Sequence, residues 1–310
     1  MDYFDWIPDP LILQIFNSVS DVKTLARCRA VSRRFSSLVP QSDSLLLRVD
    51  RVVSESDLDS LLLLSFLKTL FKSLLSTFLS PKAFALPSSD NDSAPNSPAR
   101  ILRGFDRIRE LDIELPAGDL RLEKGTVVRY KAAFGASLKS CVILGFSGEG
   151  GGGFTEGLRE RVAWVISALI TASARHAYVA REVVGQHGNL VRLVVRDREG
   201  EGEVTMDARG IEECRQAVAE SGALEGSRTA PMVPSVRMRM RHLKMAEIGP
   251  GVCLEGATLV VVRPSGSHGE CGDNVEDADL AMEAFGGGVY GNAVEALLRS
   301  RSHMLEMNSL

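Results

Sequence analysis

Two stretches decide how the chain begins to fold: Ile7-Pro8-Asp9-Pro10-Leu11-Ile12-Leu13-Gln14-Ile15-Phe16 and Ala30-Val31-Ser32-Arg33-Arg34-Phe35-Ser36-Ser37-Leu38. Pro8 suits a first helical turn, where its missing N–H costs nothing. Apolar residues then recur at the spacing of one helical face: Leu11, Ile12, Ile15, Phe16 and Val19. Asp21 is a candidate N-cap for a second short helix, and Val31, Phe35 and Leu38 form one side of a third. The pattern predicts three short helices.

Three helices in under 40 residues have little core of their own. We therefore expect their remaining apolar face to pack against another protein, helix into groove. The alternative is an ordinary N-terminal helical hairpin whose apolar residues face the rest of the chain.

Residues 4–45 resemble the F-box, the adaptor-docking module of ubiquitin ligase receptors. Ile7 stands where that family usually has Leu, and Phe35 where many members carry Trp. The resemblance implies that a Skp-type adaptor contacts eight residues: Ile7, Pro8, Leu11, Ile15, Phe16, Leu25, Val31 and Phe35.

The resemblance extends along the chain to a plant F-box group that includes the auxin-up-regulated F-box proteins. It is carried by five segments: 107–116, 134–145, 172–176, 256–260 with 263–265, and 305–309. It implies the substrate-recognition subunit of a Skp–cullin–F-box (SCF) ubiquitin ligase, located in the nucleus and cytosol. The expected partners are the adaptor, a cullin held through it, and a target protein. The resemblance brings no catalytic residue and no cofactor.

Composition fits this class of protein. The 310 residues are 45% hydrophobic and 25% charged, with a net charge of −4, which is typical of one or two soluble globular domains and argues against nucleic-acid binding by a whole domain. Five widely spaced cysteines behind an acidic start indicate a reduced, intracellular protein. Asp59, Lys68 and Lys72 interrupt the leucine-rich stretch 58–79, which favours an amphipathic helix over a membrane span.

We predict an α+β fold in four parts: the F-box at 1–45, an amphipathic helical connector at 46–79, a disordered Ser/Pro loop at 80–99 and a mixed α/β recognition domain at 100–310. The helix at 58–79 is the expected strut between the two folded modules.

Strand-like stretches within the recognition domain lie at 108–115, 138–145 and 190–197, with helical stretches expected at about 125–136 and 155–187. This order predicts partly parallel strands that resemble degenerate leucine-rich repeats. Asp207 is expected to cap a further helix. The C-terminal part is predicted to contain antiparallel strands from Ser235 to Arg263, followed by helical spacing at 275–300 with a glycine break at 286–288.

The candidate target-binding residues are Arg237, Arg239 and Arg241. Period two puts the three guanidinium groups on one face of a strand, where they could grip an acidic or phosphorylated segment. The alternative is a solvated charged face that discourages aggregation.

A second hypothesis for the chain is an F-box-containing binding protein that acts outside a ligase. The glycine run 148–153 satisfies a dinucleotide-binding template, so a nucleotide-binding enzyme is a third hypothesis, although four consecutive glycines match almost any glycine template. His268, Cys271 and Asp273 are too few for a structural zinc site. No cofactor or metal is therefore predicted.

Overall fold

The computed structural model describes residues 6–49, 101–116, 126–147, 154–223, 232–249, 251–266 and 273–309. The predicted connector beyond residue 49, the Ser/Pro loop, the glycine run 148–153 and the His268–Cys271 segment lie outside the described residues.

The chain begins with the three predicted helices, α1 (Asp9–Val19), α2 (Val22–Arg29) and α3 (Arg33–Leu38). Asp21 caps α2, as expected, by accepting a hydrogen bond of 2.9 Å from the backbone N–H of Thr24. Ser32 caps α3 in the same way, 3.1 Å from the N–H of Phe35. A 3-10 turn, η2 (Val39–Gln41), ends this N-terminal module.

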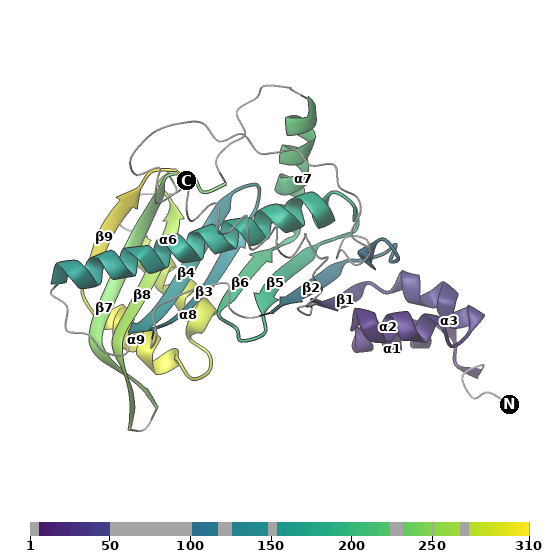
Figure 1. Ribbon diagram of the computed structural model, residues 1–310, viewed down its shortest axis with the longest axis horizontal. Coiled ribbons are helices and arrows are strands. Elements are labelled where there is room, and N and C mark those ends of the chain that lie inside the picture. The colour runs from purple at the N-terminus through teal and green to yellow at the C-terminus, as the bar shows by residue number, and fades with distance from the viewer. Residues whose placement is uncertain are drawn as a thin grey trace, which may run out of the picture.

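One mixed sheet dominates the part of the chain that the structure describes (Figure 1). Its strands are β1 (Ser44–Arg48), β2 (Glu110–Leu115), β3 (Thr126–Phe134), β4 (Leu138–Ser147), β5 (Arg192–Asp197), β6 (Gly202–Met206), β7 (Val236–Gly249), β8 (Val252–Pro264) and β9 (Ser302–Met307). Their order is β1-β2-β5-β6-β3-β4-β8-β7-β9. β1, β2 and β5 are parallel neighbours, whereas β3, β4, β8, β7 and β9 form an antiparallel half. The predicted α+β class is confirmed.

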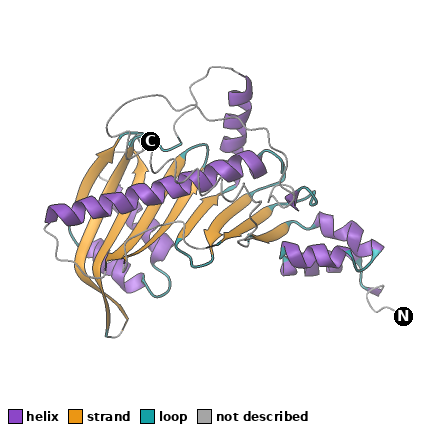
Figure 2. Cartoon of the chain, in the orientation of Figure 1, coloured by secondary structure: helices purple, strands orange, loops and turns teal. Residues whose placement is uncertain are grey.

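Helices cover both faces of the antiparallel half (Figure 2). The long helix α6 (Phe154–Val179) and its π-helical continuation η3 (Ala180–Val184) cross one face, with α7 (Ala208–Ala223) beyond them. The helices α8 (Asp273–Phe285) and α9 (Gly291–Arg299) lie on the opposite face. Strands buried on both faces have continuous apolar sequences, which explains the run at 141–146.

The prediction of a helix at 125–136 is wrong, because residues 126–134 form β3. Buried side chains alternate along it at Val128, Tyr130, Ala132 and Phe134, the period of a strand. Residues 46–48 also belong to a strand, β1, and do not start a helical connector. The antiparallel β7–β8 pair, the helix capped by Asp207 and the glycine break between α8 and α9 are all confirmed.

By length and composition, the helical stretch Gly157–Val184 could cross a membrane, but half of its most apolar window is buried within the protein. Its close packing on the sheet depends on Gly145 in β4, where an added Cβ would lie only 2.8 Å from the Trp164 ring. The apolar character of α6 is therefore that of a core helix.

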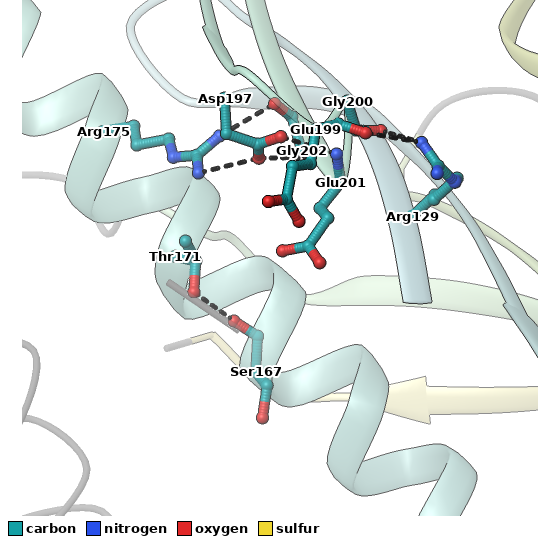
Figure 3. A network of polar contacts seen from close by, with 9 residues as sticks. All are labelled: Arg129, Ser167, Thr171, Arg175, Asp197, Glu199, Gly200, Glu201 and Gly202. Carbon is teal, nitrogen blue, oxygen red and sulfur yellow. Dashed lines mark hydrogen bonds and ion pairs between the residues drawn. The ribbon is translucent and has the colours of Figure 1, made fainter. Parts of the chain in front are cut away.

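A buried ion pair fastens α6 to the β5–β6 hairpin (Figure 3). Arg175 Nη2 lies 3.2 Å from Asp197 Oδ2, and both side chains are only 2% exposed. Arg175 Nη1 also donates to the carbonyl of Gly202 at 2.8 Å, while Asp197 accepts from the N–H groups of Glu201 and Gly202. Arg129 completes the network by donating to the carbonyls of Glu199 and Gly200. The two buried charges thus neutralise each other at the point where the hairpin turns.

Replacing Arg175 alone leaves the carboxylate of Asp197 buried without its cation. We expect Arg175→Met to lower the free energy of unfolding by about 3–5 kcal/mol. The control is Arg192→Met, which breaks the exposed pair with Asp112 and should cost no more than about 1 kcal/mol. Urea unfolding of both variants measures the difference, and equal costs would contradict a structural role for the buried pair.

Stability should also depend on His176, which is 2% exposed, stacks on Phe134 and donates from Nε2 to the carbonyl of Gly135 at 2.9 Å. Burial lowers its pKa from 6.5 to about 4, although the hydrogen bond to Gly135 opposes the shift. Because the folded pKa is depressed, the unfolded chain binds the proton first as the pH falls. About 3 kcal/mol of stability, present above pH 6.5, should be lost progressively between pH 6.5 and pH 4.

The control for this prediction is the variant His176→Gln. The free energy of unfolding of wild type and variant is measured in urea across the same pH range. The stability of wild type minus that of the variant should fall with acidity. A difference that stays constant from pH 6.5 to pH 4 would contradict the assignment.

Candidate functional site: the exposed face of the N-terminal module

Helix α1 carries two adjacent apolar stripes that point in different directions. Ile12 and Phe16 are buried, with 1% and 3% of their surface exposed. Leu11 and Ile15, one residue earlier in each turn, are 51% and 46% exposed. The single wide face read from the sequence therefore splits into a core stripe and a solvent stripe.

The other predicted adaptor-contacting residues divide in the same way. Pro8 and Val31 are exposed, Val31 to 70%, and Ile7 is half-buried. Leu25 is fully buried, and half-buried Phe35 packs edge-on against Phe16 with 5.2 Å between ring centroids. Phe16 and Leu25 thus serve the core of the module, whereas Pro8, Leu11, Ile15 and Val31 are accessible to a partner.

Two exposed apolar residues were missed from the sequence as contact candidates. Trp6 is 80% exposed just before α1, and Val19 is 38% exposed at its end. Val19 continues the i, i+4, i+8 spacing of Leu11 and Ile15, so the same periodicity could have identified it. Trp6 precedes the helix and carries no periodic signal.

The module is held in one shape by contacts between its ends. Arg34 in α3 donates to Asp9 Oδ1 at 2.6 Å and to the carbonyl of Ile7, which ties α3 to the first turn of α1. The pair is partly exposed, so its main effect is on geometry. It fixes the start of α1, from which Pro8 and Leu11 project.

The module is also joined to the sheet without a hinge. The N–H of Leu46 in β1 donates to the carbonyl of Ser20 at 2.9 Å, and β1 pairs in parallel with β2. Arg48 lies between two carboxylates, 3.5 Å from Asp21 and 3.6 Å from Glu114. Burial alone would raise the pKa of Asp21, but hydrogen bonds from Thr24 and the charge of Arg48 hold it below its ordinary value. Module and sheet share one hydrophobic core.

The arginine stripe of β7 lies on the face that α8 and α9 cover. Arg239 is 9% exposed, and its Nε donates to Asp277 at 2.7 Å. Arg241 donates from Nη1 to the carbonyls of Leu298 and Ser300 at the end of α9. A solvated face is therefore the wrong description of Arg239, which serves the fold.

Arg237 is partly exposed and lines a small hollow with Arg239, Arg263 and Met304. Target binding by the three arginines stays a prediction, with Arg237 and Arg241 more accessible than the buried Arg239. Among the described residues, no group of three or more His, Cys, Asp or Glu side chains could hold a metal ion.

Three short helices, two of them capped by side chains and one with an outward apolar stripe, are fixed to one end of a sheet and define a docking module on a folded body. Residues 4–51 match the F-box-like family. Over their whole lengths, this chain is 48% identical to F-box protein AUF2 and 46% identical to F-box protein AUF1, both from Arabidopsis thaliana. The chain therefore belongs to the plant F-box protein family, in the auxin-up-regulated group that its sequence resembles. No solved structure matches it.

Membership of this family supports a general role as substrate adaptor in an SCF ubiquitin ligase. F-box domains generally bind Skp-type adaptors, and F-box proteins are generally non-catalytic. The exposed stripe of α1 gives this general role a physical basis in the present chain.

The two stripes of α1 should respond differently to truncation. Phe16→Ala removes a buried ring that contacts Phe35 and should destabilise the protein by about 3–5 kcal/mol. Leu11→Ala removes an exposed side chain and should change stability by no more than about 0.5 kcal/mol. Thermal or urea unfolding of the full chain tests this contrast, and a large loss for Leu11→Ala would place Leu11 in the core.

Proposed function

We propose that this protein is the substrate-recognition subunit of an SCF ubiquitin ligase that promotes ubiquitination and proteasomal degradation of a target protein. The observation that carries the proposal is the set of large apolar side chains left exposed on the N-terminal module: Trp6, Leu11, Ile15, Val19 and Val31. Leu11, Ile15 and Val19 follow one another along one side of α1, and contiguous apolar patches on a protein surface mark interaction sites.

The proposed mechanism is proximity. The F-box fixes the chain to a Skp-type adaptor and, through it, to a cullin. The rest of the chain binds the target and holds its lysines near a ubiquitin-charged enzyme. Binding of this kind raises effective concentration and requires no chemistry from the chain itself.

The geometry favours this mechanism because the module is anchored to the sheet. The backbone bond from Leu46 to Ser20 and the charges around Arg48 hold the two parts in a fixed relation. A target bound on the sheet domain would then be presented in one orientation, which shortens the search for a productive geometry. β1 supplies one connection between the module and the sheet, and the strut predicted at 58–79 lies outside the described residues.

Two alternatives make different predictions. An F-box protein that acts outside a ligase would bind the adaptor but not recover a cullin. A nucleotide-binding enzyme built on the glycine run would lose an activity when residues 149–152 are deleted. We also propose that the protein works in the nucleus and cytosol, which localisation of a fluorescent fusion would test.

Adaptor binding can be tested with matched surface variants. The full chain should co-purify with a Skp-type adaptor, and Leu11→Arg/Val31→Arg should weaken binding by at least about tenfold, because buried apolar anchors dominate interface energies. The control is Val289→Arg, a residue 66% exposed between α8 and α9. Variants of Phe16 or Phe35 are unsuitable because they disturb the core.

Failure of well-folded wild type to bind the adaptor would overturn the F-box function. Equal binding by the wild type and the double variant would overturn the assignment of the exposed stripe. Recovery of a cullin with the wild-type complex then separates the ligase from the alternative without one.

A further inference from the structure

The most exposed of the large apolar side chains in the described part of the chain is Trp6, at 80%. The sequence has one other tryptophan, Trp164, which is only 5% exposed and packs closely over Gly145 in β4. Tryptophan is among the residues that carry most of the binding energy at protein interfaces, because its large ring is buried there at a low cost in conformational entropy. Trp6 adds little to the fold of the free chain and is accessible to a partner.

Trp6 lies at the end of the N-terminal module that is farther from the sheet. The helices α1 to α3 project from the β1 end of the sheet (Figure 1). Ser20, directly after α1, accepts a hydrogen bond from the N–H of Leu46 in β1, so the last turn of α1 is the one beside the sheet. The helix has 11 residues, which places its first turn about 16 Å farther along its axis. Trp6 precedes that first turn.

A second strongly exposed apolar side chain belongs to the same end of the module. Val31, in the turn between α2 and α3, is 70% exposed. Arg34, in the first turn of α3, donates to the carbonyl of Ile7, the residue next to Trp6, and to Asp9 in the first turn of α1. The start of α3 therefore lies against the start of α1. We call Trp6 and Val31 the outer pair.

The exposed stripe of α1 begins beside the outer pair. The N–H of Leu11 donates to the carbonyl of Pro8, so Leu11, which is 51% exposed, stands in the first turn of the helix. Ile15 and Val19 follow it at intervals of four residues along the same side of the helix. A partner that covers this stripe up to Leu11 therefore reaches the end of the module that carries the outer pair.

The backbone that follows Trp6 is held in place. The side chain of Ile7 packs against the hydrophobic core, and its carbonyl accepts the hydrogen bond from Arg34. Pro8 has its φ fixed by its own ring and caps α1. A side chain next to a fixed backbone loses less conformational freedom when it binds, which favours affinity.

We propose that Trp6 is an anchor for the Skp-type adaptor and inserts into an apolar pocket of that partner. The inference rests on the proposed function, because it names a further contact at the same docking surface. The adaptor is the occupant because the outer pair continues the stripe assigned to it, and the partly exposed Arg34–Asp9 pair supplies a polar rim. Trp6 lies outside the eight residues that the F-box resemblance assigns to adaptor contact.

Binding kinetics of the full chain test the anchor. Trp6→Ala should weaken adaptor binding by at least about tenfold, mainly through faster dissociation. Trp6→Phe keeps an aromatic ring and should retain most of the affinity. The matched control is Met245→Ala, which truncates a side chain 58% exposed on β7. Surface plasmon resonance measures the rates, and the urea midpoint of each variant should equal that of wild type.

The two tryptophans allow the contact to be observed directly. Adaptor binding should transfer Trp6 from water to an apolar pocket and shift its fluorescence emission to shorter wavelength, whereas Trp164 is already buried. The spectrum of the wild-type complex minus that of the Trp6→Phe complex isolates Trp6, because Trp164 and any tryptophan of the adaptor contribute to both.

The possible outcomes separate this inference from the proposed function. Failure of well-folded wild type to bind the adaptor would overturn both. If Leu11→Arg/Val31→Arg weakens binding while Trp6→Ala does not, the function stands and Trp6 is no anchor. A lowered urea midpoint for Trp6→Ala would assign Trp6 to the fold instead. Self-association of the chain that Trp6→Ala abolishes, with adaptor binding unchanged, would assign it to a second copy, and either result overturns the inference.

Discussion

The pairing of β1 with its two neighbours is the constraint on which the rest of the molecule depends. β1 is bonded to β2 on one side and to the carbonyl of Ser20 on the other, so a strand of five residues belongs to the F-box and the sheet at once. Three helices with little core of their own gain one by sharing apolar residues with the sheet domain. Because the core is shared, the F-box cannot reorient relative to the sheet domain as it could on a flexible linker.

Helices cover both faces of the antiparallel half of the sheet, and this determines which side chains of β7 a partner can reach. Residues 141–146 and 259–262 are apolar on both sides, and α6, α8 and α9 cover them. Arg239 and Arg241 lie beneath α8 and α9 and bond to an aspartate and to helix-terminal carbonyls. A charge stripe with strand periodicity therefore anchors two helices to the sheet.

The sequence predicts local structure well where a signal is repeated within one segment. Apolar spacing and the caps at Asp21 and Asp207 located helices correctly, and the β7–β8 pair followed from alternation. β3 was missed because its buried positions include Ala132 and its outward positions are mixed, so a strand period was read as a helix. The order of the strands could not be predicted from the sequence. β2 pairs with β5 some 80 residues later, through contacts that no local pattern encodes. The burial of Arg239 was missed because its partner, Asp277, comes from a distant helix.

The same limit explains how the F-box motif must be interpreted. Leu11 and Ile12, like Ile15 and Phe16, are neighbours in sequence with opposite roles, one exposed and the other buried. A helix turns about 100° per residue, so a motif that lists both members of each pair combines a docking surface with the core that supports it. Loss of adaptor binding after substitution of Phe16 or Leu25 would therefore report a collapsed module. Loss after substitution of Leu11 or Val31, with the fold intact, would report the surface itself.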